Sequence, residues 1–221
     1  MVEIPRAIPR RERLIAALDV PTASEARTLV GKLGGCVSHY KIGLELATAG
    51  GYYELLDWLV KRGSRVFCDL KLYDIPETVR RAVSNLRGRG VGFLTVHGDR
   101  AIMEAAAKEK GEVKILAVTV LTSLGSADLA EMGYSGSMEQ LVLARARGAA
   151  ESGCDGVIAS GLEAAGIKSE FAEKLLVVTP GIRPAGGTMR KDTTSAAGAE
   201  TMDAISRCAT ASGRTLPRML A

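Results

Sequence analysis

The chain has 221 residues, of which 47% are hydrophobic and 24% are charged. This composition is typical of a globular domain and excludes a disordered chain, a collagen-like repeat and a coiled coil. Twenty-nine basic against 25 acidic residues give a net charge of +4, which favours an anionic small molecule as ligand; scattered basic residues and 4% aromatic residues disfavour nucleic acid.

Neither a membrane anchor nor an export signal is predicted. No apolar run approaches the roughly 20 residues that a membrane-spanning helix needs. The apolar stretch over residues 14–18 is too short for a signal peptide and stops at Asp19. The cysteines form no C-x-x-C pair, so we interpret them as buried thiols of a cytoplasmic protein rather than as a disulfide frame or a zinc site. They are Cys36, Cys68, Cys154 and Cys208.

In chain order, short apolar runs alternate with longer segments of helical spacing. Strands that are apolar on both faces and separated by helices predict parallel β-α units. The expected strands cover residues 14–20, 38–44, 65–70, 92–97, 113–120, 155–159 and 175–179. The expected helices cover residues 23–32, 53–61, 76–87, 102–108, 138–151 and 163–173. The expected caps are Thr22 or Ser24 for the first helix, Asp74 before Pro76, and Ser137 before Met138.

Seven such units end by residue 180, and an eighth fits the remaining length. The sequence therefore predicts an α/β fold, a small (β/α)8 TIM barrel whose eighth unit is incomplete or divergent. The whole chain, 1–221, is expected to form one domain. A doubly wound sheet is the competing architecture, because periodicity does not decide whether a sheet closes. Its dinucleotide-binding form is disfavoured, since no G-x-G-x-x-G follows the first strand.

The third expected strand leads into a D-x-K-x-x-D motif made of Asp69, Lys71 and Asp74. By the two-residue strand period, Asp69 and Lys71 point to one face, the barrel interior, while Leu70 and Leu72 point to the other. A lysine there is costly unless paired, so its ammonium is expected to lie between Asp69 and Asp74. Such an ammonium stays protonated and is able to protonate a carbanion. The alternative is a structural ion-pair network at the barrel rim.

Further polar residues lie at the expected ends of other strands. Lys41, inside an otherwise apolar strand, is expected to pair across the barrel with Asp19 or Asp69. We interpret His97 as a hydrogen-bonded rim residue rather than a catalyst, and His39 as structural.

The seventh expected strand ends in Thr-Pro-Gly-Ile-Arg-Pro, residues 179–184, and two more glycines follow at 186 and 187. Glycines that expose backbone N–H groups beside Arg183 predict a phosphate-binding loop, in a place where barrels often bind phosphate. The alternative is a plain glycine-rich turn.

Taken together, these motifs resemble the orotidine 5′-phosphate decarboxylase family, in family order, over residues 12–187. The D-x-K-x-x-D motif alone indicates only a superfamily that includes hexulose-phosphate synthase and ketogulonate-phosphate decarboxylase. The full series is more specific. Its segments are residues 18–21, 40–43, 69–78, 95–97, 118–123 and 179–184.

The resemblance implies that the chain decarboxylates orotidine 5′-phosphate to UMP in pyrimidine biosynthesis, without metal or organic cofactor. It implies that Lys71 protonates C6 of the pyrimidine and that Asp69 lies beside the departing carboxylate. It also implies a homodimer in which Asp74 reaches into the partner subunit's site. The implied substrate-binding residues are Asp19 and Lys41 at the ribose, Thr122 near the pyrimidine, Arg183 at the phosphate, and Ile75, Thr78, Pro180 and Gly181.

After Gly187 the sequence departs from the family pattern, and residues 188–221 are divergent. Residues 200–205 resemble the start of the eighth strand, but polar and small residues follow where the family has a Gly-Arg phosphate grip. Gly213 and Arg214 come later, which makes Arg214 the remaining candidate for that contact. Three explanations stay open: a diverged but working terminus, an altered reading frame near the end of the gene, or a cloning artefact.

Two other functions are alternatives to the decarboxylation of orotidine 5′-phosphate. One is another phosphosugar lyase or decarboxylase of the same barrel superfamily, similar to the magnesium-dependent hexulose-phosphate synthase. The other is a weakly active barrel that binds a phosphate ligand.

Overall fold

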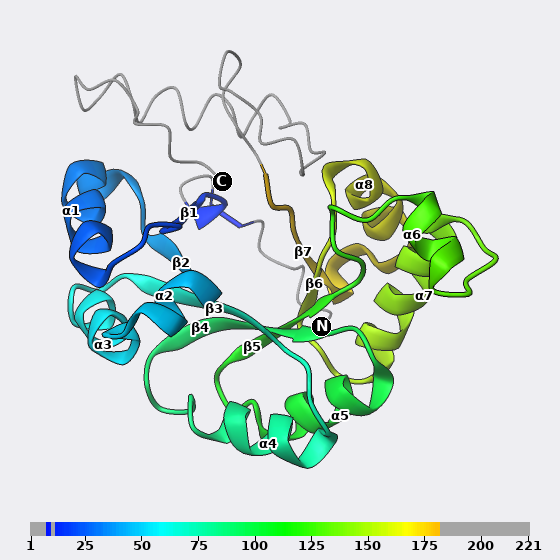
Figure 1. The fold of residues 1–221 in the computed structure, drawn as a ribbon, viewed down its shortest axis with the longest axis horizontal. Coiled ribbons are helices and arrows are strands. Elements are labelled where there is room, and N and C mark those ends of the chain that lie inside the picture. Colours follow the sequence, from blue (N-terminus) through cyan, green and yellow to red (C-terminus); the bar gives the residue numbers. More distant parts are fainter. Residues whose placement is uncertain (1–7, 10–11, 182–221) are drawn as a thin grey trace, which may run out of the picture.

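In a computed structural model of the protein, residues 8, 9 and 12–181 are described. Their strands form one parallel sheet in sequential order, which curls into a half-barrel (Figure 1). Sequential order is that of a barrel, whereas a doubly wound sheet reverses direction at a switch point, so that alternative is wrong. The strands are β1 (Ile15–Ala17), β2 (His39–Gly43), β3 (Arg65–Leu72), β4 (Val91–His97), β5 (Lys114–Val118), β6 (Gly156–Ile158) and β7 (Leu176–Val178). The expected eighth unit falls outside the described residues.

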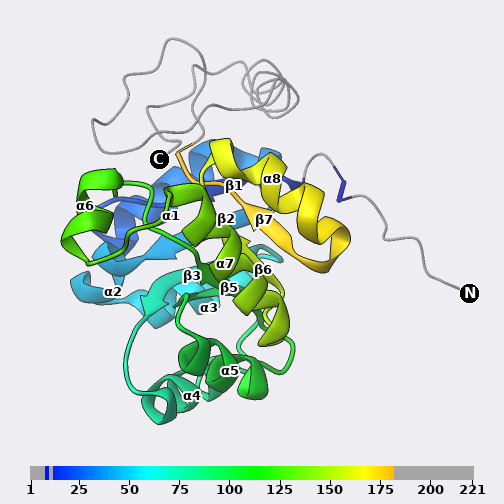
Figure 2. The ribbon, with the colours of Figure 1, turned by 90° about the vertical axis from the view of Figure 1, so that its right-hand side faces the viewer.

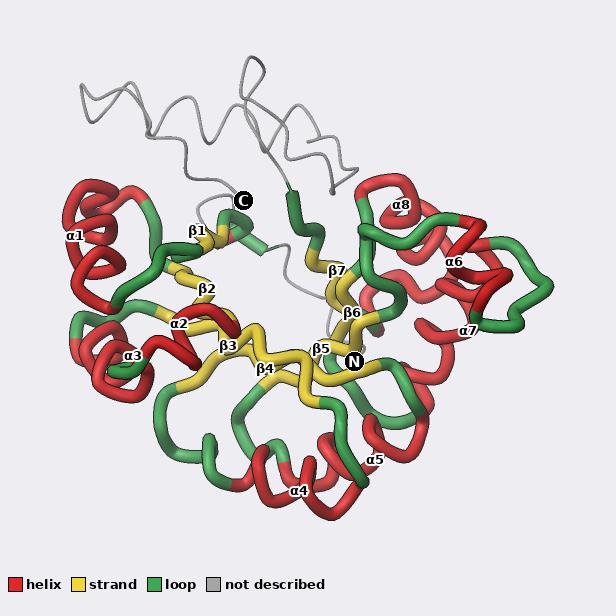
Figure 3. Tube along the Cα trace, in the orientation of Figure 1, coloured by secondary structure: helices red, strands yellow, loops and turns green. Residues whose placement is uncertain are grey.

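Helices cover the outer face of the curved sheet (Figures 2 and 3). Each long helix connects one strand to the next strand in the chain. All six expected helices are present. The structure adds two short helices, α2 and α6, that the sequence pattern did not predict. The helices are α1 (Ala23–Leu33), α2 (Leu44–Ala49), α3 (Tyr52–Lys61), α4 (Pro76–Ser84), α5 (Arg100–Glu109), α6 (Ser126–Glu131), α7 (Met138–Glu151) and α8 (Gly161–Phe171). Within the described residues, none of them is long and apolar enough to cross a membrane.

Local side-chain hydrogen bonds explain where several helices begin. The Thr22 hydroxyl accepts the backbone N–H of Glu25 at the start of α1, and Ser137 forms a capping box at the start of α7. Asp74 does not cap α4 as expected. Its Oδ1 accepts the N–H of the next residue, Ile75, which is itself the N-cap before the proline that opens the helix.

The apolar core has two layers, one between sheet and helices and one inside the half-barrel. The two-residue period of β5 divides its side chains between them: Ile115 and Ala117 belong to the outer layer, Leu116 and Val118 to the inner. Burial on both faces is why the strands read as continuous apolar runs. The buried members of the inner layer are Phe67, Leu116, Val118 and Ile158.

The pairing of β3 with β4 is irregular where the D-x-K-x-x-D motif begins. Three residues of β3, 69–71, lie opposite a single residue of β4, Thr95. Lys71 has a φ of 46°, which non-glycine residues rarely adopt. A bulge of this kind redirects the side chains at the end of a strand. The pairs that flank it are Cys68 with Leu94 and Leu72 with Val96.

Candidate active site

Asp69 and Lys71 form the centre of the site, at the carboxyl end of β3. The Lys71 ammonium donates to both carboxylate oxygens of Asp69 over 2.9 Å each. Leu70 and Leu72 pack instead against the outer core layer. The predicted division of these four side chains between two faces is therefore confirmed, although a bulge rather than a regular strand produces it.

Lys41 extends this pair into a line of alternating charges across three strands. Its Nζ lies 2.8 Å from Oδ1 of Asp19, after β1, and 3.5 Å from Oδ2 of Asp69. Both partners proposed for Lys41 are confirmed, because one ammonium reaches both carboxylates. The expected direction is wrong, since these carboxylates stand on or just after the strands next to β2 and not across the barrel. In the order Asp19, Lys41, Asp69, Lys71 the charges alternate in sign, so each of them has a partner of opposite sign.

The ammonium groups determine the charge state of Asp69. Burial by itself would raise the pKa of this carboxyl group, but Lys71, Lys41 and hydrogen bonds from Lys71 and Thr95 outweigh it and lower the pKa below its usual value. Asp69 is therefore ionised at neutral pH and available to hold both ammonium groups.

Thr95 of β4 is a component that the sequence reasoning did not single out. Its hydroxyl accepts the backbone N–H of Lys71 and donates to Oδ1 of Asp69, each over 2.9 Å. The signal available in the sequence was a hydroxyl residue inside an otherwise apolar strand, two positions before His97.

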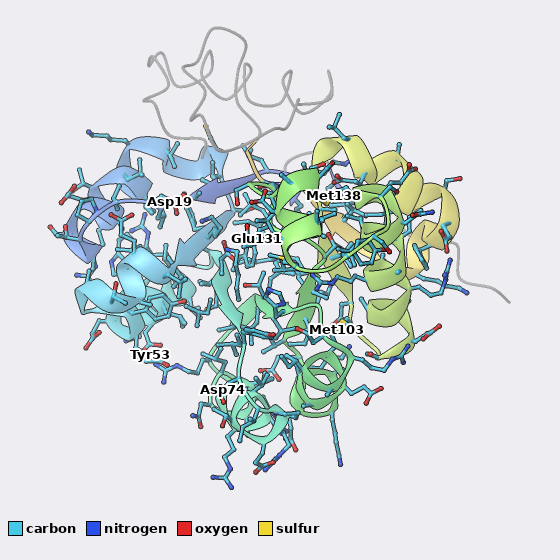
Figure 4. All side chains as sticks on the ribbon, turned by 45° about the vertical axis from the view of Figure 1, so that its right-hand side comes forward. Asp19, Tyr53, Asp74, Met103, Glu131 and Met138 are labelled. Atoms are coloured by element: carbon cyan, nitrogen blue, oxygen red, sulfur yellow. The ribbon has the colours of Figure 1, made fainter. Side chains whose placement is uncertain are left out.

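Asp74 lies apart from this cluster within the same chain. It is exposed on the connection between β3 and α4, and Figure 4 shows it well away from Asp19. The expectation that the Lys71 ammonium lies between Asp69 and Asp74 is therefore wrong for one chain: among the described residues of this subunit, its carboxylate partner is Asp69. Ile75 is also exposed, and Thr78 lies in the first turn of α4, where its N–H bonds the Ile75 carbonyl.

His97 ends β4 next to this connection. Its Nδ1 lies 3.2 Å from Oδ2 of Asp99, which confirms its interpretation as a hydrogen-bonded rim residue. Its ring contacts that of Tyr73 at 4.4 Å between centroids. The exposed Tyr73 ring is thereby fixed on the same rim as Asp74.

The loop after β5 carries Thr122, which is partly buried. Two contacts fix the backbone where this loop begins. The guanidinium of Arg145, from α7, donates to the carbonyl of Thr119 over 2.5 Å, and the Thr119 hydroxyl donates to the carbonyl of Ile158 over 2.9 Å. The Arg145 contact was not predicted, because it joins residues 26 positions apart.

Pro180 and Gly181 follow β7 at the end of the described residues, and Gly181 has a positive φ of 76°, which suits glycine. Arg183 and Arg214, the predicted phosphate contacts, lie outside the described residues. Among those that are described, no group of three or more His, Cys, Asp or Glu side chains is arranged to hold a metal ion.

The model of the orotidine 5′-phosphate decarboxylase/HUMPS family matches residues 12–213. The chain belongs to this family. Membership accounts for the order of the motifs along the sequence, and the predicted family is confirmed.

Individual relatives agree with this assignment. Orotidine 5′-phosphate decarboxylase of Methylococcus capsulatus is 55% identical over 179 residues, which cover 81% of this chain and 74% of that protein. The enzyme of Nitrobacter winogradskyi is 52% identical over 179 residues, 80% of this chain and 74% of that protein. The solved structure of orotidine 5′-phosphate decarboxylase from Lactobacillus acidophilus superimposes with a TM-score of 0.74 at 29% identity, covering 89% of this chain and 97% of that one. The predicted α/β barrel class is thus confirmed.

Proposed function

We propose that this member of the orotidine 5′-phosphate decarboxylase family converts orotidine 5′-phosphate to UMP and that Lys71 protonates C6 of the pyrimidine. The reaction is that of the relatives that share about half of its residues. For the role of Lys71, the supporting observation is its ammonium, held by both oxygens of Asp69 at the carboxyl end of a parallel barrel strand.

The chemistry requires a fixed positive charge. Breaking the bond between C6 and the carboxylate releases carbon dioxide and leaves the electron pair on C6, where no conjugated acceptor takes it up. An ammonium preorganised beside C6 stabilises this pair and then transfers a proton to it. Lys71 is left as a neutral amine, which takes a proton from water before the next turnover.

Asp69 has two roles in this proposal. It orients the Lys71 ammonium through two hydrogen bonds, and it places a negative charge beside the departing carboxylate of the substrate. Its lowered pKa supports both roles, since each needs the ionised form. Repulsion between two carboxylates would disfavour the bound substrate relative to the transition state.

Substrate binding is assigned to residues around this pair. Asp19 and Lys41, joined by a 2.8 Å ion pair, would hold the ribose hydroxyls. Binding energy from the remote phosphate would lower the barrier at C6. The other assigned residues are Ile75, Thr78, Thr122, Pro180, Gly181, Arg183 and Arg214.

The proposal includes a homodimer in which Asp74 completes the site of the second subunit. Asp74 is exposed and is flanked by Tyr73 and Ile75, each 67% exposed. Two large apolar side chains on either side of a carboxylate support a contact with another protein surface. In an isologous dimer each subunit would supply its Asp74 to the partner.

Mixing two inactive variants tests this sharing. Lys71→Ala and Asp74→Asn, mixed in equal amounts and allowed to exchange subunits, would form heterodimers with one intact site. We expect recovery of about a quarter of wild-type activity. As a control, Lys71→Ala mixed with the Lys71→Ala/Asp74→Asn double variant recovers none. Absence of recovery after demonstrated subunit exchange would contradict a shared site.

The proposed location is the cytoplasm, the compartment of thiol-containing enzymes without disulfides. Cys68 and Cys154 are buried free thiols, whereas Cys36 is only partly buried, so the expectation of buried thiols is wrong for Cys36. Burial raises the pKa of Cys68 to about 11, which keeps this thiol protonated and unreactive. Cys208 lies outside the described residues.

The deciding experiment follows the loss of orotate absorbance when the purified protein meets orotidine 5′-phosphate without added metal. We expect turnover that a chelator does not change. Turnover of a hexulose phosphate that the chelator abolishes would favour the magnesium-dependent relative instead. Binding of UMP, measured as a raised melting temperature, without turnover would leave only a phosphate-ligand-binding barrel.

A further inference from the structure

The bulge in β3 removes regular backbone pairing next to the reacting ammonium. Residues 69–71 of β3 share one opposing residue, Thr95, so the backbone of β4 does not supply a partner for each of their polar groups. Buried backbone N–H groups need a hydrogen-bond acceptor. For Lys71 that acceptor is the Thr95 hydroxyl, 2.9 Å from its nitrogen.

The directions of the hydrogen bonds at Thr95 follow from the chemistry of the groups. The N–H of Lys71 is only a donor, so the hydroxyl oxygen accepts from it. The ionised Asp69 carboxylate is only an acceptor, so the hydroxyl proton points to its Oδ1, at 2.9 Å. The same Oδ1 accepts the Lys71 ammonium at 2.9 Å. One hydroxyl therefore closes a ring that joins the backbone of Lys71 to the carboxylate that holds its side chain.

This ring constrains a conformation that the chain would otherwise avoid. A φ of 46° is unfavourable for lysine, and it persists only where the surroundings fix it. Thr95 is fully buried, with an exposure of 0%, so solvent does not replace its hydrogen bonds. Its position on β4 is in turn held by regular pairing with β5.

We propose that Thr95 is a positioning residue of the decarboxylation, whose hydroxyl fixes the Lys71 backbone in the bulge and the Asp69 carboxylate beside it. This inference rests on the proposed function. Thr95 does not touch the reacting atoms. It acts by setting where the Lys71 ammonium stands relative to C6, and a displacement of about 1 Å at such a point costs roughly 100-fold in rate.

A valine at this position separates the role of the hydroxyl from that of packing. Thr95→Val keeps the branched shape but removes the acceptor for the Lys71 N–H and one donor to Asp69. Asp69 would then face Lys71 on its own strand and Lys41 from β2, with Asp19 beyond Lys41. Since the Thr95 hydrogen bond helps to lower the pKa of Asp69, its loss raises that pKa.

The kinetic test compares Thr95→Val and Thr95→Ser with the wild type in turnover of orotidine 5′-phosphate across pH. We expect Thr95→Val to lower kcat by about 10- to 100-fold with little change in KM, and to move the acidic limb of the profile to higher pH. Thr95→Ser keeps a hydroxyl at this position, so its kcat and its acidic limb should lie close to those of the wild type. An unchanged kcat and acidic limb in Thr95→Val, or a serine variant no better than the valine, overturns the proposal.

Thr119→Val is the matched control. Thr119 is also buried, and its hydroxyl donates to the carbonyl of Ile158 rather than to a charged group. We expect Thr119→Val to lower the free energy of unfolding as much as Thr95→Val does, while the acidic limb of the pH profile of kcat stays in place. A shift of the limb in both variants would mean that general loosening of the barrel, not the hydroxyl at Thr95, moves it.

Two measurements without substrate keep this test independent of the proposed function. Titration of the Asp69 carboxyl by carbon NMR is expected to show a higher pKa in Thr95→Val than in the wild type. Hydrogen exchange is expected to be slow at the Lys71 amide of the wild type, a result that needs no variant to fold. Fast exchange there, or an unchanged Asp69 titration, contradicts the ring even if turnover is normal. An inactive wild type with a protected Lys71 amide would contradict only the proposed function.

Discussion

The two sides of the half-barrel interior differ in what fills them. On the side of β1–β3, the carboxyl ends of the strands carry charged side chains in alternating sign, from Asp19 to Lys71. On the side of β5–β7, the described side chains of the inner layer near the carboxyl ends of the strands are apolar. There, Val118 and Ile158 are buried and Val178 packs against them.

Polar groups are present on the apolar side too, and several of them bind backbone. Arg145 holds the carbonyl of Thr119, and Ser160 caps α8 in a capping box with Glu163. Among the described residues, ion pairs that join the carboxyl ends of strands therefore lie on the side of β1–β3. The other side supplies apolar side chains and a loop whose backbone is held by hydrogen bonds, and a fixed charge acts more strongly beside apolar groups than in water.

Removal of the Lys71 ammonium is expected to give the largest effect. Lys71→Ala takes away both the proton donor and the charge that stabilises the carbanion, and it should lower kcat by about 1,000-fold or more. Folding should survive, because Asp69 keeps Lys41 at 3.5 Å. Absorbance assays together with thermal unfolding check this. An active, folded Lys71→Ala protein would remove Lys71 from the mechanism.

On the apolar side, truncation should affect stability rather than chemistry. Ile158→Ala removes a buried side chain of the inner layer and is expected to lower the free energy of unfolding by about 2–5 kcal/mol. Denaturant unfolding measures the loss, and kcat at a temperature where the variant is folded should stay within a few-fold of wild type. A kcat loss as large as that of Lys71→Ala would mean that the two sides do not divide their tasks in this way.

A smaller effect is expected at the far end of the charged line. Asp19→Asn keeps the shape but removes the negative charge 2.8 Å from the Lys41 ammonium. If this pair holds the ribose, KM should rise about tenfold, the size of one charge-assisted hydrogen bond, with a smaller change in kcat. Steady-state kinetics measure the effects on KM and on kcat separately. A drop in kcat alone would place Asp19 with the proton-transfer groups instead.

The smallest expected effect concerns His39, buried at the start of β2. Burial lowers the pKa of His39 below its ordinary value of 6.5, and Arg65 and Lys114 add to this while Glu12 opposes it. The folded protein thus binds this proton less tightly than the unfolded chain, so its stabilising contribution is complete above pH 6.5 and declines as pH falls. Denaturant unfolding at several pH values should show the free energy of unfolding falling as the pH drops below 6.5. In His39→Gln this dependence on pH should be weaker. An equal slope in the variant would assign the pH dependence to other groups.

The repeating pattern of the sequence predicted the seven strands and the six long helices, because burial on both faces of a strand and one face of a helix leaves a periodic signature. It also predicted that Asp69 and Lys71 share a face. It missed α2 and α6, which span six residues each and are too short to show a period.

The pattern could not show the details that depend on neighbouring strands. A regular strand was assumed across the motif, whereas three residues of β3 face Thr95 alone. The expected contact between Lys71 and Asp74 of one chain is wrong for a related reason. The chain turns outward after the bulge, and Asp74 lies on the exposed connection to α4.

By itself, the sequence determined the class of fold, the family and the strand ends where charged residues stand, since these depend on composition, period and motif order along one chain. Only the tertiary structure decided that Lys41 bridges Asp19 and Asp69 and that Thr95 ties Lys71 to its carboxylate. The reason is physical: these contacts join residues 22 to 28 positions apart, at the ends of strands that lie side by side only once the sheet has formed.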